Sequence, residues 1–183
     1  MKKTILTGLV IFITSCINVP TFYNGKVLGN KFTNNSLELT IPNNWKVRGM
    51  GGHTILILQK KVAQNGIFAF PTVILEEGTI YANNFHTYFN NTWSLVKGSQ
   101  EDYSMNEIYR TNNEIDSSDV NGIKFYSFET KIINKKFKIA EMLQIHYYFN
   151  IDTMYFHLSV SDYDKFENLK TDYKSLIESI KKK

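Results

Sequence analysis

A long series of alternating apolar and polar residues in the second half of the chain is the feature that most constrains the fold. The alternation predicts strands over residues 103–112, 122–133, 137–150 and 153–161. Sequences typical of tight turns lie between them, at Asn121-Gly122, Asn134-Lys135-Lys136 and Ile151-Asp152. Because such short turns join antiparallel neighbours, this half of the chain is predicted to form an antiparallel meander.

Three strands and a helix are predicted before the meander. The strands cover residues 36–41, 53–60 and 67–76. The middle strand is apolar on both faces, so it is expected to lie centrally and to be covered on both sides. The helix runs from Thr79 to Lys97 and carries an aromatic stripe, which we interpret as core packing rather than as a ligand site.

A second helix is predicted at the C-terminus. Asp162 is a suitable N-cap, and an apolar stripe continues at helical spacing to Ile180. The lysines that follow, Lys181–Lys183, would then lie at the negative end of the helix dipole. This explanation of the basic tail is preferred to a role at a membrane surface.

Cys16 is the only cysteine of the chain and closes a short N-terminal segment. Lys2 and Lys3 precede an apolar run over residues 5–13, which is too short to span a bilayer as a helix. The segment resembles a bacterial lipoprotein signal, in which the cysteine is lipidated and becomes the first mature residue. Residues 1–15 are therefore predicted to be a signal peptide and Cys16 the lipid attachment site. An ordinary signal peptide with a chance cysteine is the alternative.

The lipoprotein prediction sets the expected organisation of the rest of the chain. Residues 16–32 are expected to be a flexible tether, and residues 33–183 a single domain. A lone thiol cannot form an internal disulfide, so the domain must be stabilised by its core. The formal charge of +4 includes Lys2 and Lys3, so the mature chain carries 4 − 2 = +2. Its sequence shows neither a broad basic face nor a nucleic-acid motif. No nucleic-acid partner is expected.

The order of the elements resembles the PsbP/Mog1/DcrB-like superfamily. Its entry motif, an aliphatic strand followed by Pro-x-x-Trp, is matched from Leu37 to Trp45. The resemblance covers most of residues 33–183 and implies an α+β fold: an α/β/α sandwich around a mostly antiparallel sheet, with a central helix and a C-terminal amphipathic helix. Members of the family are mostly binding, chaperone or assembly proteins without catalytic residues, and several bacterial members are exported lipoproteins.

Two histidines are the most specific candidates for chemistry. A two-residue turn at Ile151-Asp152 would place His146 directly opposite His157 on a polar-aromatic face. We define the His–Tyr face as the candidate binding surface that also holds two tyrosines: His146, Tyr148, Tyr155 and His157. Two imidazoles are too few for a zinc site, so no metal is predicted. Their proximity could instead make the pair sensitive to pH.

No catalytic motif accompanies these residues, and no cofactor is predicted. The sequence favours a non-enzymatic, lipid-anchored protein of the bacterial cell envelope that binds a protein partner, as an assembly or chaperone-like module. The alternative is a carrier of a small apolar ligand with a helix-grip or lipocalin-like fold, which would need a cavity under the long helix. A hydrolase is a third, weaker possibility.

Overall fold

The computed structural model describes residues 25–60, 71–78, 85, 87, 89–90, 106–110, 115–134, 141–162 and 170–183. The predicted signal peptide and Cys16 lie outside these residues. So does most of the predicted helix over 79–97, of which Phe85, Thr87, Phe89 and Asn90 are described and are helical.

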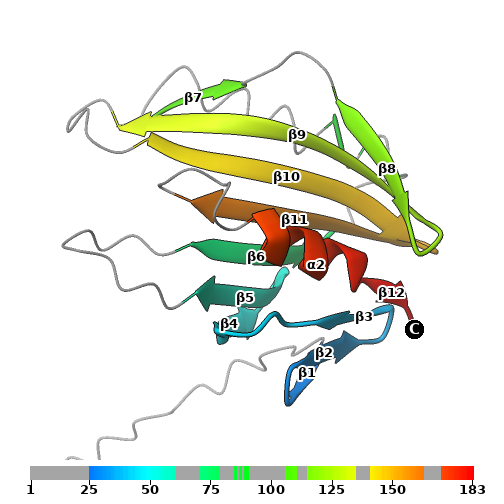
Figure 1. The fold of residues 1–183 in the computed structure, drawn as a ribbon. Helices are drawn as coiled ribbons and strands as arrows, with labels where there is room; N and C mark the ends of the chain where they lie inside the picture. Colours follow the sequence, from blue (N-terminus) through cyan, green and yellow to red (C-terminus); the bar gives the residue numbers. More distant parts are fainter. Residues whose placement is uncertain are drawn as a thin grey trace, which may run out of the picture.

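An antiparallel eight-stranded sheet forms most of the described structure (Figure 1). Seven strands follow the order β4-β5-β6-β11-β10-β9-β7, and β8 pairs with β9 beside them. The strand bounds are β4 (Trp45–Gly51), β5 (Thr54–Lys60), β6 (Thr72–Glu77), β7 (Asn106–Arg110), β8 (Asp116–Val120), β9 (Ile123–Asn134), β10 (Glu141–Ile151) and β11 (Met154–Asp162).

A smaller antiparallel sheet lies at the opposite end of the molecule from β7 (Figure 1). Its order is β1-β2-β3-β12, which joins the first described strands to the last one. The bounds are β1 (Gly25–Leu28), β2 (Lys31–Asn34), β3 (Leu37–Thr40) and β12 (Lys181–Lys182). Ordered strands therefore begin inside residues 16–32, the range that we assigned to a tether.

The helix α2 (Lys170–Glu178) packs on one face of the eight-stranded sheet. It buries Tyr173, Leu176 and Ile177 in the main core, and its first turn is held to the sheet by Asp172. The Nε1–H group of Trp45 donates to Asp172 Oδ2 at 3.1 Å, and the ammonium of Lys60 pairs with the same oxygen. These contacts explain why Trp45, at the end of the Pro-x-x-Trp motif, is a structural residue.

The predicted α/β/α sandwich with a central helix is wrong. The described residues form a mostly antiparallel β structure of two sheets, in which α2 is the one helix with defined bounds. The prediction contained too few strands, because several strands of the structure carry no apolar alternation in their sequence. β8, for example, has the sequence DSSDV and exposes all its side chains but that of Val120, because it only extends one edge of β9. No described helix is long and apolar enough to cross a membrane.

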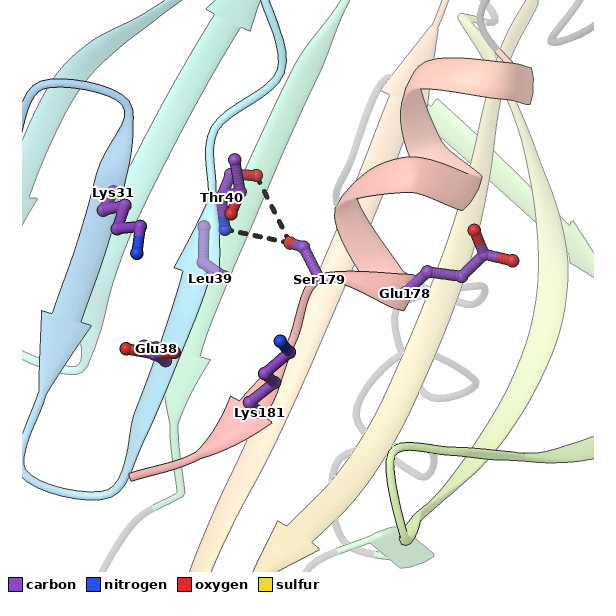
Figure 2. A pocket seen from close by; sticks show the side chains of 7 residues that line it. All are labelled: Lys31, Glu38, Leu39, Thr40, Glu178, Ser179 and Lys181. Carbon is purple, nitrogen blue, oxygen red and sulfur yellow. Dashed lines mark hydrogen bonds between the residues drawn. The ribbon is translucent and has the colours of Figure 1, made fainter.

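The prediction that Lys181–Lys183 end the last helix is also corrected. α2 ends at Glu178, and the chain then turns at Ser179 into β12, which pairs with β3. Ser179 Oγ accepts the backbone N–H of Thr40 at 2.9 Å (Figure 2). It also lies 2.7 Å from the carbonyl oxygen of Leu176. The lysines consequently belong to the edge of the small sheet rather than to the helix.

Candidate functional site

A half-open groove of about 520 Å³ lies between α2 and the strands β8, β9 and β10. We call it the α2 groove. Its apolar lining comes from both walls: Val120, Ile145 and Tyr147 from the strands, and Tyr173 and Ile177 from the helix. The alternation of β9 and β10 directs these strand residues to the helix side of the sheet, where Phe125 and Phe149 belong to the core.

The rim of the α2 groove is charged and polar. Lys170, Lys174 and Glu178 line it from the helix, whereas Asp116 and Glu129 line it from the strands. Lys174 and Glu178 are one helical turn apart, with 3.7 Å between the ammonium and the carboxylate. The groove thus combines an apolar floor with charges of both signs, a composition that suits an amphipathic surface better than a highly charged ligand.

Two tyrosine hydroxyls lie among carboxylates at the groove. Burial raises the pKa of Tyr147, and the charge of Glu129 raises it further. Burial also raises the pKa of Tyr173, with smaller contributions from Asp162 and Asp172. Both phenols therefore stay neutral near pH 7 and retain an O–H group for hydrogen bonding.

The two histidines are diagonal neighbours, not directly opposite as predicted. The turn between β10 and β11 is Asp152-Thr153, so Ile151 pairs with Met154 and His146 lies opposite Ser159. His157 lies opposite Tyr148. The predicted register was wrong by two residues, a shift that keeps every side chain on its predicted face. The imidazoles still meet, with 3.0 Å between His146 Nδ1 and His157 Nε2.

A continuous row of hydrogen bonds runs through this pair, and we call it the histidine chain. His146 Nε2 lies 2.9 Å from Thr130 Oγ1, and His157 Nδ1 lies 3.1 Å from Glu76 Oε2. With Glu76 ionised and both imidazoles neutral, the following protonation pattern satisfies every contact. Thr130 donates to His146, His146 donates through Nδ1 to His157, and His157 donates through Nδ1 to the carboxylate.

The environment of the histidine chain favours the neutral form of His146 and the ionised form of Glu76. Burial lowers the pKa of His146 to about 3, and the charge that His157 would carry when protonated adds to the effect. The hydrogen bond from His157 is the main reason why the pKa of Glu76 is lowered. Protonation of either group would therefore oppose the native arrangement.

The His–Tyr face is largely interior. Tyr148, His146 and His157 are 0%, 4% and 7% exposed, whereas Tyr155 is only partly buried. Phe85 and Phe89 pack over this side of the sheet, and Phe89 meets the ring of Tyr148 edge to face at 5.0 Å. The structure thus corrects the prediction that these four residues form an exposed binding surface, because three of them are core side chains.

Thr130 and Glu76 were not identified from the sequence. Glu76 lies directly opposite His157 in the pairing of β6 with β11, and Thr130, on β9, lies opposite Gln144 and diagonal to His146. Only the strand order of the sheet brings them together, and that order was not predicted. Within the described segments there is no group of three or more histidine, cysteine, aspartate and glutamate residues that could hold a metal ion.

No protein-family model and no curated protein matches the sequence. Solved structures do match its fold. The solution structure of the cyanobacterial PsbP (CyanoP) of Synechocystis sp. PCC 6803 has a TM-score of 0.52 at 13% identity, over 92% of this chain and 97% of that chain. LpqN of Mycobacterium tuberculosis, described as involved in cell envelope biogenesis, has a TM-score of 0.52 at 9% identity, over 80% and 82% of the two chains.

A crystal structure from Bacteroides thetaiotaomicron VPI-5482 also has a TM-score of 0.52, at 5% identity. The match covers 80% of this chain but only 45% of that longer chain. At these identities the comparisons show the fold alone, and the fold is PsbP-like. The part of the predicted resemblance that concerns PsbP is therefore confirmed at the level of the fold.

Proposed function

We propose that this protein is a non-enzymatic, lipid-anchored module of the bacterial cell envelope that binds a partner protein in the α2 groove. The observation that carries the proposal is the groove itself, with an apolar floor between two secondary-structure walls and a rim that holds charges of both signs. The fold shared with LpqN, which is described as involved in cell envelope biogenesis, supports an envelope role. The lipoprotein-like segment ending at Cys16 supports the anchor.

A carrier of a small apolar ligand is the second candidate. The volume of about 520 Å³ lies within the usual range for small-molecule sites, which is about 300–1,000 Å³. The groove also lies under the C-terminal helix, as this alternative requires. A partner protein remains the first choice because the wall formed by β8 exposes Asp116 and Ser118 to solvent, which leaves this side accessible to a large surface.

Replacing Cys16 with alanine should abolish lipidation and leave the protein extractable from the membrane by high salt. Cys16 carries the only thiol in the chain. No other residue can therefore hold a diacylglyceryl group through a thioether or an acyl chain through a thioester. Metabolic labelling with a palmitate analogue, followed by membrane fractionation, measures both effects. Labelling that persists in Cys16→Ala, or a wild-type protein that is never labelled, would contradict the anchor.

Placing an arginine in the α2 groove should prevent capture of the partner. Ser118→Arg introduces a long cation on the groove wall of β8, whereas Ser117→Arg introduces the same side chain at the neighbouring position, which does not line the groove. Both serines are exposed, so both variants should fold with the melting temperature of the wild type. The partner is captured by crosslinking in the native envelope and identified by mass spectrometry.

The expected result is one protein that is crosslinked to the wild type and to Ser117→Arg, and at least tenfold less to Ser118→Arg. A bound small molecule in native mass spectra, displaced only by Ser118→Arg and without any crosslinked protein, would favour the carrier instead. Equal crosslinking of both variants would show that the partner binds elsewhere.

A further inference from the structure

The outer face of the small sheet carries a compact group of lysines. Cross-strand pairs in an antiparallel sheet share a face, and the register aligns two rows here. One row contains Leu28, Lys31 and Thr40, and the other contains Lys26, Thr33, Glu38 and Lys181. The opposite face belongs to the core, because Phe32, Leu37 and Leu39 are buried there. We call the outer group the lysine face: Lys26, Leu28, Lys31, Glu38 and Lys181.

The lysine face has an excess of positive charge. Lys26, Lys31 and Lys181 are exposed, and Glu38 is the one acidic residue in these two rows. No ion pair within the described part of the chain neutralises the three lysines. Lys182, in contrast, points elsewhere and pairs with Asp152 at 2.5 Å. Figure 2 shows Lys31 and Lys181 on either side of β3, around a depression of about 180 Å³ that Glu38 and Glu178 also line.

The position of Lys181 is fixed by the fold. Ile180 is fully buried and Ser179 is hydrogen-bonded to Thr40, so the chain enters β12 in a defined direction. Lys181 then pairs with Glu38 in register. A basic tail that would be mobile at the end of a helix is thereby built into a sheet, next to lysines from the first described strands.

An exposed apolar side chain accompanies these charges. Leu28 is 67% exposed, at the end of the β1–β2 hairpin beside Lys31. It is the most exposed large apolar residue in the described part of the chain. Lysines around a protruding leucine are typical of surfaces that rest on anionic lipid, where the cations meet headgroups and the apolar side chain enters the interface.

The chain length before β1 places this face near the anchor. Eight residues separate Cys16 from Gly25, the first residue of β1. Even fully extended, the nine steps between these two residues span only about 30 Å. A lipid on Cys16 would therefore keep the lysine face within about 30 Å of the membrane. The α2 groove adjoins this face, because Glu178 lines both the groove and the depression beside Lys181.

We propose that the lysine face is a docking surface for an anionic membrane, which holds the small sheet of the anchored domain against the lipid. The proposal deepens the lipid-anchored function given above, but the contact needs no acyl chain. Binding of the lysine face to vesicles can be measured on full-length protein with Cys16 replaced by alanine. A lysine face that does not bind and a Cys16 that is not lipidated therefore give different results.

The test compares vesicles of phosphatidylcholine alone with vesicles that also contain phosphatidylglycerol. The ratio of the two partition coefficients isolates the charge-dependent binding, because the apolar N-terminus contributes to both. The test variant replaces Lys26, Lys31 and Lys181 with glutamine. The matched control replaces Lys124, Lys170 and Lys174, which are exposed on β9 and α2, so the change in net charge is identical.

Each lysine at an anionic surface changes binding about fivefold, so the wild-type ratio should exceed ten. The test variant should lower this ratio at least tenfold, and the control variant less than twofold. The difference should vanish when salt is raised from about 0.1 M to about 1 M, which shortens the screening length from about 10 Å to about 3 Å. Tryptophan fluorescence of Leu28→Trp should also shift to the blue only with phosphatidylglycerol.

Three results would overturn the proposal. The first is a wild-type ratio near one. The second is an equal decrease in both triple variants, which would show that only net charge matters. The third is an unchanged vesicle ratio in the test variant together with loss of a crosslinked acidic protein, which would assign the lysine face to a protein instead of the membrane.

Discussion

The free energy of unfolding should fall by about 2 kcal/mol when the pH is lowered from about 8 to about 5, because of the buried histidine chain. Burial lowers the pKa of His146 from 6.5 to about 3 in the folded protein. Between these two values the unfolded chain binds a proton that the folded chain does not, so stability decreases as the pH falls. Well above pH 6.5 His146 is neutral in both the folded and the unfolded chain, so its full contribution to stability is present.

Glu76 acts in the same direction at lower pH. Its pKa is lowered from 4.5 in the folded protein, so the unfolded chain takes up its proton first and stability decreases further below that value. Urea unfolding at closely spaced pH values measures the combined curve. The section between pH 6.5 and 5 reports mainly on histidine, because most carboxyl groups are still ionised there.

Replacing His146 with phenylalanine should flatten this section of the curve, even though the variant is less stable at every pH. The loss of stability follows because Thr130 and His157 each lose a hydrogen-bond partner. His53→Gln is the control, since His53 is exposed in the turn before β5 and takes no part in the hydrogen bonds of the histidine chain. A flat wild-type curve from pH 8 to 5 would contradict the assignment, as would an NMR titration that protonates His146 near pH 6.5.

The strands of the meander could be predicted because their burial follows their sequence. β10 and β11 alternate apolar residues toward one face, and the sequence therefore indicated which side of each strand is core. The turn at Asn121-Gly122 is confirmed for the same local reason. Both residues have positive φ, 53° and 76°, a conformation that this dipeptide adopts readily.

Other elements depend on contacts between distant parts of the chain. β12 forms only because β3 offers an edge to Lys181 and Lys182, and nothing in a run of lysines indicates a strand. Ile180 continues the apolar spacing of the helix, which led the prediction to extend the helix too far. It is buried from the turn after α2 instead.

In the candidate site, too, local features could be predicted from the sequence, whereas contacts between distant parts of the chain could not. The sequence identified His146 and His157 as neighbours, because both belong to consecutive strands joined by a short turn. Their burial was missed, since imidazoles and phenols beside them resemble a solvent-facing surface until Phe85 and Phe89 are placed over them. The α2 groove could not be predicted at all, because its width depends on where the helix packs relative to β8.

The largest loss of stability from a single substitution is expected for Phe149→Ala. Phe149 is fully buried at the centre of three adjacent strands, where its cross-strand partners are Phe125 on β9 and Phe156 on β11. The ring centroids are 4.6 Å and 5.2 Å away, so the three rings form one aromatic row across the sheet. Truncation would remove the central ring and leave a cavity that the paired backbones cannot close.

A decrease of about 3–5 kcal/mol in the free energy of unfolding is expected for this change, which is the range for burial lost at a phenylalanine. Chemical denaturation of Phe149→Ala and of Ser117→Ala, an exposed control on β8, gives the difference directly. Phe149→Leu should recover about half of the loss, because it fills part of the cavity without restoring the ring contacts. A loss below about 1 kcal/mol for the alanine variant would mean that the row is not part of the core. In that case the packing of α2 above it, and with it the α2 groove, would also have to be reconsidered.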